Sequence, residues 1–241
     1  MPDLEVILER FKKHLLSSAV RDSIGKIILF GSHAKGTAVP DSDIDILLVL
    51  TDGLEAEKSV LNEVYEFMTE QSASLEVVTS SVTEFFFSPD YFLRNISHYG
   101  REVYSMSEEE LKLAAVRELK GLAEEYLESA EEVLDRGRLR LAIDAAYNAC
   151  ELAAKGLILL KQDDLPGSHG GVVSSFGQLY VKAGEVEKQI GRDLNLALKL
   201  RNEARYKPGA LLRRENAVEL LSLARRLLEF IEEKTGSGGN P

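Results

Sequence analysis

The strand signals in this 241-residue chain stop at residue 104, and this change limits the fold more than any other feature. Up to that point, short apolar runs alternate with amphipathic stretches, as in a small sheet covered by helices. From residue 107 onward, apolar residues recur only at helical spacing. We therefore predict an α+β fold in two domains, a small mixed-sheet domain at residues 1–106 and an all-α helical bundle at residues 107–235. We expect residues 236–241 to form a flexible tail.

The pattern also predicts the individual elements. In the first domain, the predicted strands cover residues 26–30, 44–50, 74–79 and 102–104, and the predicted helices cover residues 3–19, 54–70 and 90–99. In the second domain, one helix begins behind the N-cap Ser107, and the others cover residues 138–160, 172–184, 186–206 and 215–234. The helix at 138–160 is rich in alanine and apolar nearly all round, which favours burial in a bundle or in a dimer seam. We expect a homodimer formed through the helical domain.

Composition bears on the partners and the cellular compartment of such a chain. It has no apolar run near the ~20 residues of a membrane helix and no signal-peptide core, so we expect no membrane partner. One cysteine, Cys150, fits a reducing compartment, and we expect a cytoplasmic protein. The net charge of −11 disfavours a general nucleic-acid binder. It conceals a basic segment, Lys199–Arg214, which holds six basic residues and one acid.

The most informative segment of the first domain is GSHAKGTAVPDSDID, at residues 31–45. It joins two predicted strands and ends in Asp43-Ile-Asp45, whose carboxylates lie on one face because side chains alternate along a strand. Carboxylate oxygens suit Mg²⁺, which shares its coordination shell with substrate phosphates. Glu76 is the one acid inside the next predicted strand, and we predict that it is the third metal ligand.

The start of the same segment supplies candidate phosphate ligands. Gly31 lets the backbone approach a ligand closely. Ser32 and the N–H groups of the turn can hold outgoing phosphates. Lys35 is a further candidate contact to phosphate, whereas we interpret His33 as a loop residue.

Gly31-Ser32, ten further residues and Asp43-x-Asp45 together resemble the minimal nucleotidyltransferases of the DNA polymerase β superfamily, over roughly residues 10–105. The resemblance implies transfer of a nucleoside monophosphate, such as AMP from ATP or the equivalent from another nucleoside triphosphate, to an acceptor hydroxyl, with Mg²⁺ or Mn²⁺. It also implies that the first two acids bind metal and that the third binds metal or activates the acceptor. Glu76 stands where the family often has Asp, and this departure bears on acceptor activation.

Residues 142–183 resemble a HEPN domain, the helical partner of minimal nucleotidyltransferases, through the segments AAYNACELAAK and SHGGVV. The family's polar signature is an Arg, often followed by Asn, and then a His four to six residues further on. Arg201 and Asn202 match this signature, but Tyr206 stands at the first position for the His. A phenol titrates near a pKa of ~10 and an imidazole near neutrality, so we expect ribonuclease activity to be weak or absent.

Three functions remain open at this level. The first is nucleotidyl transfer in a toxin–antitoxin-like pairing with the HEPN domain, with the protein tyrosine Tyr206 as candidate acceptor. The second is an aminoglycoside-type small-molecule nucleotidyltransferase, since a cationic substrate would suit the acidic first domain. The third is a nucleotide- or RNA-binding regulator that uses Lys199–Arg214. We interpret His169 as a loop or cap residue and Tyr147 as a core residue.

Overall fold

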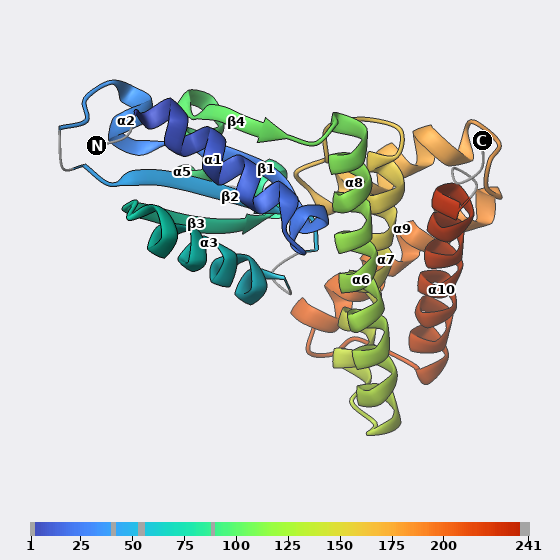
Figure 1. Cartoon of the computed structure of the whole chain (residues 1–241). Coiled ribbons are helices and arrows are strands. Elements are labelled where there is room, and N and C mark those ends of the chain that lie inside the picture. Colours follow the sequence, from blue (N-terminus) through green and yellow to red (C-terminus); the bar gives the residue numbers. More distant parts are fainter. Residues whose placement is uncertain (1–2, 40–41, 53–55, 88–89, 237–241) are drawn as a thin grey trace. The chain divides into compact units, whose positions relative to one another are not determined.

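A computed structural model describes residues 3–39, 42–52, 56–87 and 90–236 of the chain. The chain divides into two compact units, residues 1–115 and residues 116–241. The first unit holds a mixed sheet with helices, and the described part of the second unit is helical (Figure 1). The predicted α+β class is therefore confirmed. The domain limits at residues 106 and 235 stay predictions.

Within the described residues, the first unit is built on a four-stranded sheet in the order β3-β2-β1-β4. Its strands are β1 (Ile24–Leu29), β2 (Ile44–Leu50), β3 (Leu75–Ser81) and β4 (Arg101–Ser105). β1 runs antiparallel to β2 and to β4, whereas β2 and β3 are parallel. The predicted mixed sheet is confirmed, and the strand expected at residues 44–50 has the bounds of β2.

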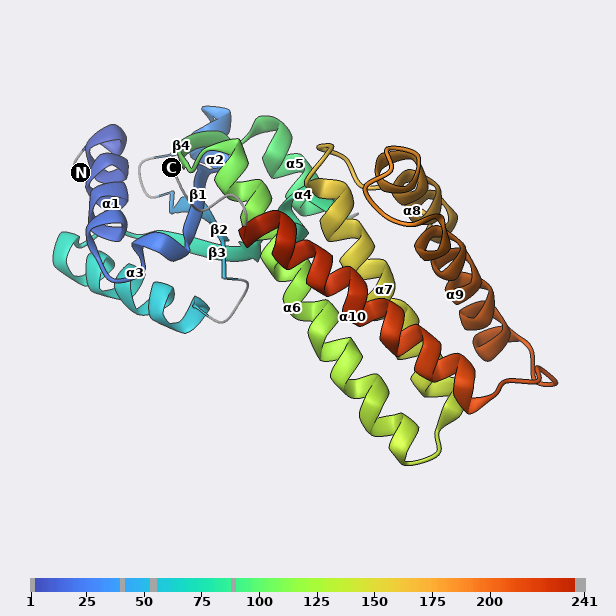
Figure 2. The ribbon, with the colours of Figure 1, turned by 90° about the vertical axis from the view of Figure 1, so that its right-hand side faces the viewer.

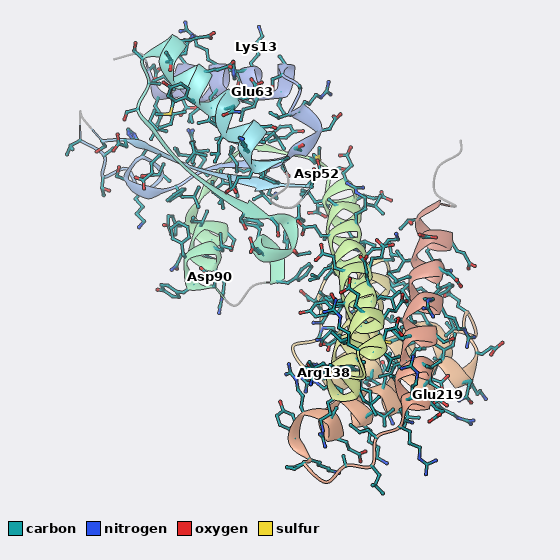
Figure 3. The ribbon with its side chains drawn as sticks, turned by 90° about the horizontal axis from the view of Figure 1, so that it is seen from below. Lys13, Asp52, Glu63, Asp90, Arg138 and Glu219 are labelled. Carbon is teal, nitrogen blue, oxygen red and sulfur yellow. The ribbon has the colours of Figure 1, made fainter. Side chains whose placement is uncertain are left out.

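Helices pack on both faces of this sheet. They are α1 (Leu4–Ser17), α2 (Gly31–Lys35), α3 (Glu57–Gln71), α4 (Val82–Phe87) and α5 (Tyr91–Tyr99), with a 3₁₀ turn at Arg21–Ser23. α1 and α3 cover one face, where the rings of Phe11 and Phe67 meet edge to face with centroids 5.1 Å apart. α4 and α5 lie on the opposite face, as the labels at Glu63 and Asp90 show in Figure 3. Because both faces are covered, β2 is apolar along most of its length.

The short helix α2 is absent from the predicted elements. The sequence predicts a turn after β1, and the structure has a five-residue helix there. Two glycines in the left-handed region bound it, Gly31 with φ of 65° and Gly36 with φ of 69°. A helix of this length shows no 3.6-residue apolar period, so hydrophobic patterning does not reveal it. The single turn and a half of α4 escapes the pattern for the same reason.

The second unit is a helical bundle around α7 (Leu139–Leu159), shown in Figure 2. Its other helices are α6 (Glu108–Asp135), which begins in the first unit, α8 (His169–Phe176), α9 (Lys188–Tyr206) and α10 (Arg214–Gly236), with a π-helical stretch at Gly177–Val181. α7 packs against α8, α9 and α10, and it buries residues around its whole circumference. The apolar surface that favoured a bundle or a dimer seam is thus covered within one chain, and the homodimer stays a prediction.

α6 begins with a capping box. Ser107 N donates to Glu110 Oε2 over 3.0 Å, and Glu110 N donates to Ser107 Oγ over 3.3 Å. These hydrogen bonds hold the pKa of Glu110 below its ordinary value. The N-cap predicted at Ser107 is confirmed. Among the described residues, no helix combines the length and the apolarity that a membrane crossing requires.

Candidate functional site

The carboxylate of Asp45 lies directly against the backbone of Gly31. A Cβ added to Gly31 would stand 1.7 Å from Asp45 Oδ2, so only glycine fits there. Gly31 also has a φ of +65°, which costs residues with a side chain about 1–2 kcal/mol. Phe30 N donates to the main-chain oxygen of Asp45 over 2.9 Å, and this bond holds the start of α2 to β2. The glycine and the acid that sequence reasoning assigns to one site are therefore in contact.

The other two predicted acids lie near the same ends of β2 and β3. Glu76 is exposed and is the register partner of Asp45, so their side chains leave the sheet on the same face. Asp43 directly precedes β2, is exposed, and accepts a hydrogen bond from Ser74 Oγ over 2.5 Å. Sequence reasoning missed Ser74. The available signal was its position two residues before Glu76, which mirrors the position of Asp43 before Asp45.

The donor chemistry of these three acids suits a hard cation. All of their side-chain donors are oxygens, which Mg²⁺ prefers. The contact between Gly31 and Asp45 also suits a cation. It places the start of α2, which has no side-chain cap, beside a carboxylate whose charge a cation would neutralise. Across residues 3–39, 42–52, 56–87 and 90–236, however, no three His, Cys, Asp or Glu side chains are grouped closely enough to hold a metal ion. The assignment of Asp43, Asp45 and Glu76 as catalytic metal ligands therefore stays a prediction.

The other residues discussed in the sequence analysis lie directly after β1. Ser32 is half-buried in α2, one residue after Gly31. His33 Nε2 lies 3.2 Å from the main-chain oxygen of Ser42, so it ties the two ends of the loop together, as expected of a loop residue. Lys35 Nζ lies 4.5 Å from the ring centroid of Tyr99, within the range of cation–π attraction. The phosphate-binding roles of Gly31, Ser32 and Lys35 stay predictions.

The polar motif of the second unit lies near the C-terminal end of α9. Arg201 is 6% exposed, and its Nη1 donates to Asn202 Oδ1 over 3.1 Å. The guanidinium carbon of Arg201 lies 5.8 Å from the ring centroid of Tyr206, and Tyr206 is 68% exposed. The structure thus brings the three motif residues together and leaves the phenol accessible.

Two residues of α7 that sequence patterns do not reveal fix this end of α9. Asp144 Oδ1 lies 2.8 Å from Arg205 Nε and 3.6 Å from Arg201 Nε. Arg140 donates hydrogen bonds of 2.7–3.4 Å to four main-chain carbonyls, those of Glu203, Ala204, Lys207 and Pro208. The last carbonyls of a helix have no partner within the helix, and Arg140 supplies one. More than 60 residues separate these partners, so no local motif signals the contact.

Two family models together account for both units. Residues 6–103 match the nucleotidyltransferase domain, and residues 116–234 match the HEPN domain. The first match includes the contact between Gly31 and Asp45, and the second includes Arg201 and Tyr206. The chain therefore belongs to the proteins that join a nucleotidyltransferase domain to a HEPN domain, and the resemblance seen in its sequence is confirmed.

Curated relatives match parts of the chain. The UPF0332 protein PH1297 of Pyrococcus horikoshii is 43% identical over 28% of this chain and 46% of its own length. The "Putative toxin MJ0605" of Methanocaldococcus jannaschii is 35% identical over 35% of this chain and 63% of its own length. The "Putative protein adenylyltransferase MJ0141" of the same organism is 25% identical over 40% of this chain and 95% of its own length. The chain thus spans less than two thirds of the first two relatives.

Proposed function

We propose that this chain is a metal-dependent nucleotidyltransferase that moves AMP from ATP to an acceptor hydroxyl, in a toxin–antitoxin-like pairing with its HEPN domain. The contact between Gly31 and Asp45 carries the proposal, because a carboxylate packed on a glycine at a helix start suits a phosphate–metal site. The names of an adenylyltransferase and of a toxin among the relatives support the pairing.

The residues of the first unit divide the chemistry between them. Asp43, Asp45 and Glu76 would hold Mg²⁺, which when bound supplies positive charge to the triphosphate. The acceptor oxygen attacks the α-phosphorus, the bond from that phosphorus to the oxygen bridging to the β-phosphorus breaks, and pyrophosphate leaves. The acceptor proton passes to the carboxylate of Glu76, on the same sheet face as Asp45. The N–H groups at the start of α2, with Ser32 and Lys35, would bind the departing phosphates.

The acceptor we propose is the phenol of Tyr206. Its side chain is 68% exposed, so an incoming nucleotide can reach it. The Arg201 guanidinium lies 5.8 Å from its ring and would attract the phosphate that is transferred. The hydrogen bonds from Arg140 to the carbonyls around Tyr206 hold the segment in one geometry, which lowers the entropic cost of positioning the acceptor.

Mass spectrometry of the full chain after incubation with ATP and Mg²⁺ tests this function. We expect one AMP on Tyr206 of the wild type and none on a variant that carries Asp43→Asn and Asp45→Asn. Tyr206→Phe keeps the ring and removes the hydroxyl, so it should abolish the adduct. Tyr91→Phe is the matched control, because Tyr91 is 79% exposed, and it should keep the adduct.

The outcomes separate the site from the acceptor. An adduct that persists in Tyr206→Phe would show that another residue accepts AMP, and peptide mapping would identify it. An adduct that the double aspartate variant forms at the wild-type rate would overturn the carboxylate site. Absence of any adduct on the wild type would exclude self-modification, and the intact mass before incubation reports AMP that the protein already carries.

A further inference from the structure

Phe30, directly after β1, brings an aromatic ring into the same row of the sheet as two of the predicted metal ligands. Phe30 N donates to the main-chain oxygen of Asp45 over 2.9 Å, which extends the antiparallel pairing of β1 with β2 by one residue. Asp45 is in turn the register partner of Glu76 on β3. Because register partners share a face, the ring and the two carboxylates leave the sheet on the same side.

The neighbours of this row identify that side. Leu29 and Ile46 lie in the hydrophobic core that the sheet shares with α1 and α3, and Val77 packs against this core. Each of these residues is next to a member of the row along its own strand, and successive side chains of a strand point to opposite faces. The row of Phe30, Asp45 and Glu76 therefore points to the side on which α4 and α5 lie (Figure 3).

Phe92 of α5 packs against the aromatic end of the row. Its ring meets the ring of Phe30 edge to face, with centroids 5.5 Å apart and an interplanar angle of 89°. Phe30 is 8% exposed, whereas Phe92 is 44% exposed, so a large part of the Phe92 ring remains open to a ligand. Asp90 Oδ1 accepts hydrogen bonds from Phe92 N over 2.7 Å and from Leu93 N over 3.1 Å. The exposed ring is therefore held in position by its own backbone as well as by Phe30.

The order of groups along the row matches the order of groups in the proposed reaction. The α-phosphorus lies at the carboxylates, and the acceptor loses its proton to Glu76, two strands away from Phe30. Adjacent strands are about 4.8 Å apart, so Phe30 and Phe92 lie on the side of Asp45 that is away from the acceptor. The nucleoside is joined to the α-phosphorus and must leave the carboxylates on a side that the acceptor does not occupy. The exposed aromatic ring lies on such a side.

We propose that Phe92, supported by Phe30, is the platform on which the nucleobase of the nucleoside triphosphate stacks, an inference that rests on the proposed nucleotidyl transfer. Bases stack on aromatic side chains through their π-faces, and every base has such a face. A phenyl ring carries no hydrogen-bonding group, so Phe92 responds to the area of the base and not to its edge. The platform therefore holds adenine and guanine alike and pyrimidines more weakly.

Calorimetric binding to the full chain in Mg²⁺ tests this platform with two probes. One is an ATP analogue with a methylene group between the α- and β-phosphorus, which cannot be cleaved there. The other is tripolyphosphate, which has the charge of the tail and no nucleoside. Phe92→Ala should lower the affinity for the ATP analogue by about tenfold and leave the affinity for tripolyphosphate unchanged. The corresponding GTP analogue should lose as much affinity as the ATP analogue.

Three further variants separate stacking from other roles of the side chain. Phe92→Tyr keeps the ring and should keep the affinity for the ATP analogue. Phe92→Leu keeps an apolar side chain without a π-face and should lose affinity as Phe92→Ala does. Phe86→Ala is the matched control, because Phe86 is a 48% exposed phenylalanine of α4 whose ring contacts Phe85 and Phe87. It should leave both affinities unchanged.

The two probes distinguish failure of the platform from failure of the proposed function. Intact mass first establishes that the protein carries no AMP, and circular dichroism that each variant is folded. The platform alone is overturned if Phe92→Ala binds the ATP analogue as tightly as the wild type, or if it loses tripolyphosphate equally. Full affinity in Phe92→Leu would also contradict stacking. A wild type that binds neither probe would overturn the nucleotidyltransferase assignment and the platform together.

Discussion

The carboxylate site of the first unit and the buried polar residues of the second unit use charge in opposite ways. In the first unit, Asp43 and Glu76 are exposed, and Asp45 is half-buried against a glycine. In the second unit, Arg201 and Glu151 are buried and paired with partners on their own and neighbouring helices. A buried charge must be paired to be tolerated, so loss of one partner in the second unit should destabilise the fold. The charges of Asp43 and Glu76 are exposed to solvent, so the stability of the fold does not depend on pairing them.

This difference predicts two mutational signatures. Substitutions at the carboxylate site should lower activity and leave the free energy of unfolding almost unchanged. Substitutions of the buried polar residues of the second unit, Glu151 and Arg201, should lower the free energy of unfolding. Glycine contacts form an intermediate class, because Gly31 both shapes the first site and tolerates no side chain.

The largest expected effect is that of Asp45→Asn on nucleotidyl transfer. Loss of a metal-binding charge worth several kcal/mol in the transition state should slow transfer by about a thousandfold. The free energy of unfolding should change by less than ~1 kcal/mol, because the amide keeps the shape of the carboxylate. Labelled AMP incorporation and urea unfolding measure the two quantities. A loss of several kcal/mol in stability would contradict the expectation that Asp45 serves activity and not stability.

Gly31→Ala should disturb both activity and stability, and Gly36→Ala is its matched control. Both glycines have a positive φ, but only Gly31 has a neighbour in the way, since nothing lies within 4 Å of a Cβ at Gly36. Gly31→Ala should cost about 3 kcal/mol, from overpacking and backbone strain combined, and Gly36→Ala about 1 kcal/mol from strain. Urea unfolding measures these values. Equal losses of stability in the two variants would show that the Asp45 side chain moves aside at little cost.

Arg140→Ala should release the end of α9. Its hydrogen bonds to four carbonyls are lost, which should cost about 2 kcal/mol and speed hydrogen exchange at residues 203–210. Arg138→Ala is the control, because Arg138 is exposed near the start of α7 and makes no side-chain cap there (Figure 3). It should change stability by less than ~0.5 kcal/mol. Unchanged hydrogen exchange in Arg140→Ala would show that Arg140 does not hold the end of α9 in place.

The smallest expected effect is a pH dependence at Glu151. Its pKa is lowered in the folded protein because the charges of Lys155 and His169 outweigh the effect of burial. The stabilisation it contributes is therefore complete above its ordinary value of 4.5 and is lost as the pH falls through the lowered pKa. Wild type should lose more stability on acidification below 4.5 than Glu151→Gln does. Parallel urea midpoints in the two proteins would contradict the pairing.

The sequence predicts the carboxylate site better than the polar contacts of the second unit, for a physical reason. Asp43 and Asp45 belong to one contiguous strand segment, and strand alternation alone puts them on one face. The bounds of β2 follow from one apolar run, residues 44–50. What patterning misses is tertiary: the short helix α2 and the approach of Gly31 to Asp45 depend on how β1 and β2 pair.

The polar contacts of the second unit depend on helix packing that a single sequence does not encode locally. His169 and Glu151 are 18 residues apart on two helices, and their contact requires the rotation of each helix to be known. Tyr147 is a core residue, as predicted, but residue spacing along the chain does not reveal which side chains contact it. The loop interpretation of His169 is wrong in one respect, since it begins α8, whose cap is Ser168. Buried polar partners across helices are thus the residues that patterning leaves unassigned.

Asp43, Asp45 and Glu76 are proposed to drive metal-dependent nucleotidyl transfer. Pyrophosphate release from ATP tests it most directly, because it reports the broken bond whatever the acceptor is. We predict release by the wild type in Mg²⁺, little release in EDTA, and a rate lower by about a thousandfold in Asp43→Asn. Equal rates for wild type and Asp43→Asn, or undiminished release in EDTA, would contradict the account.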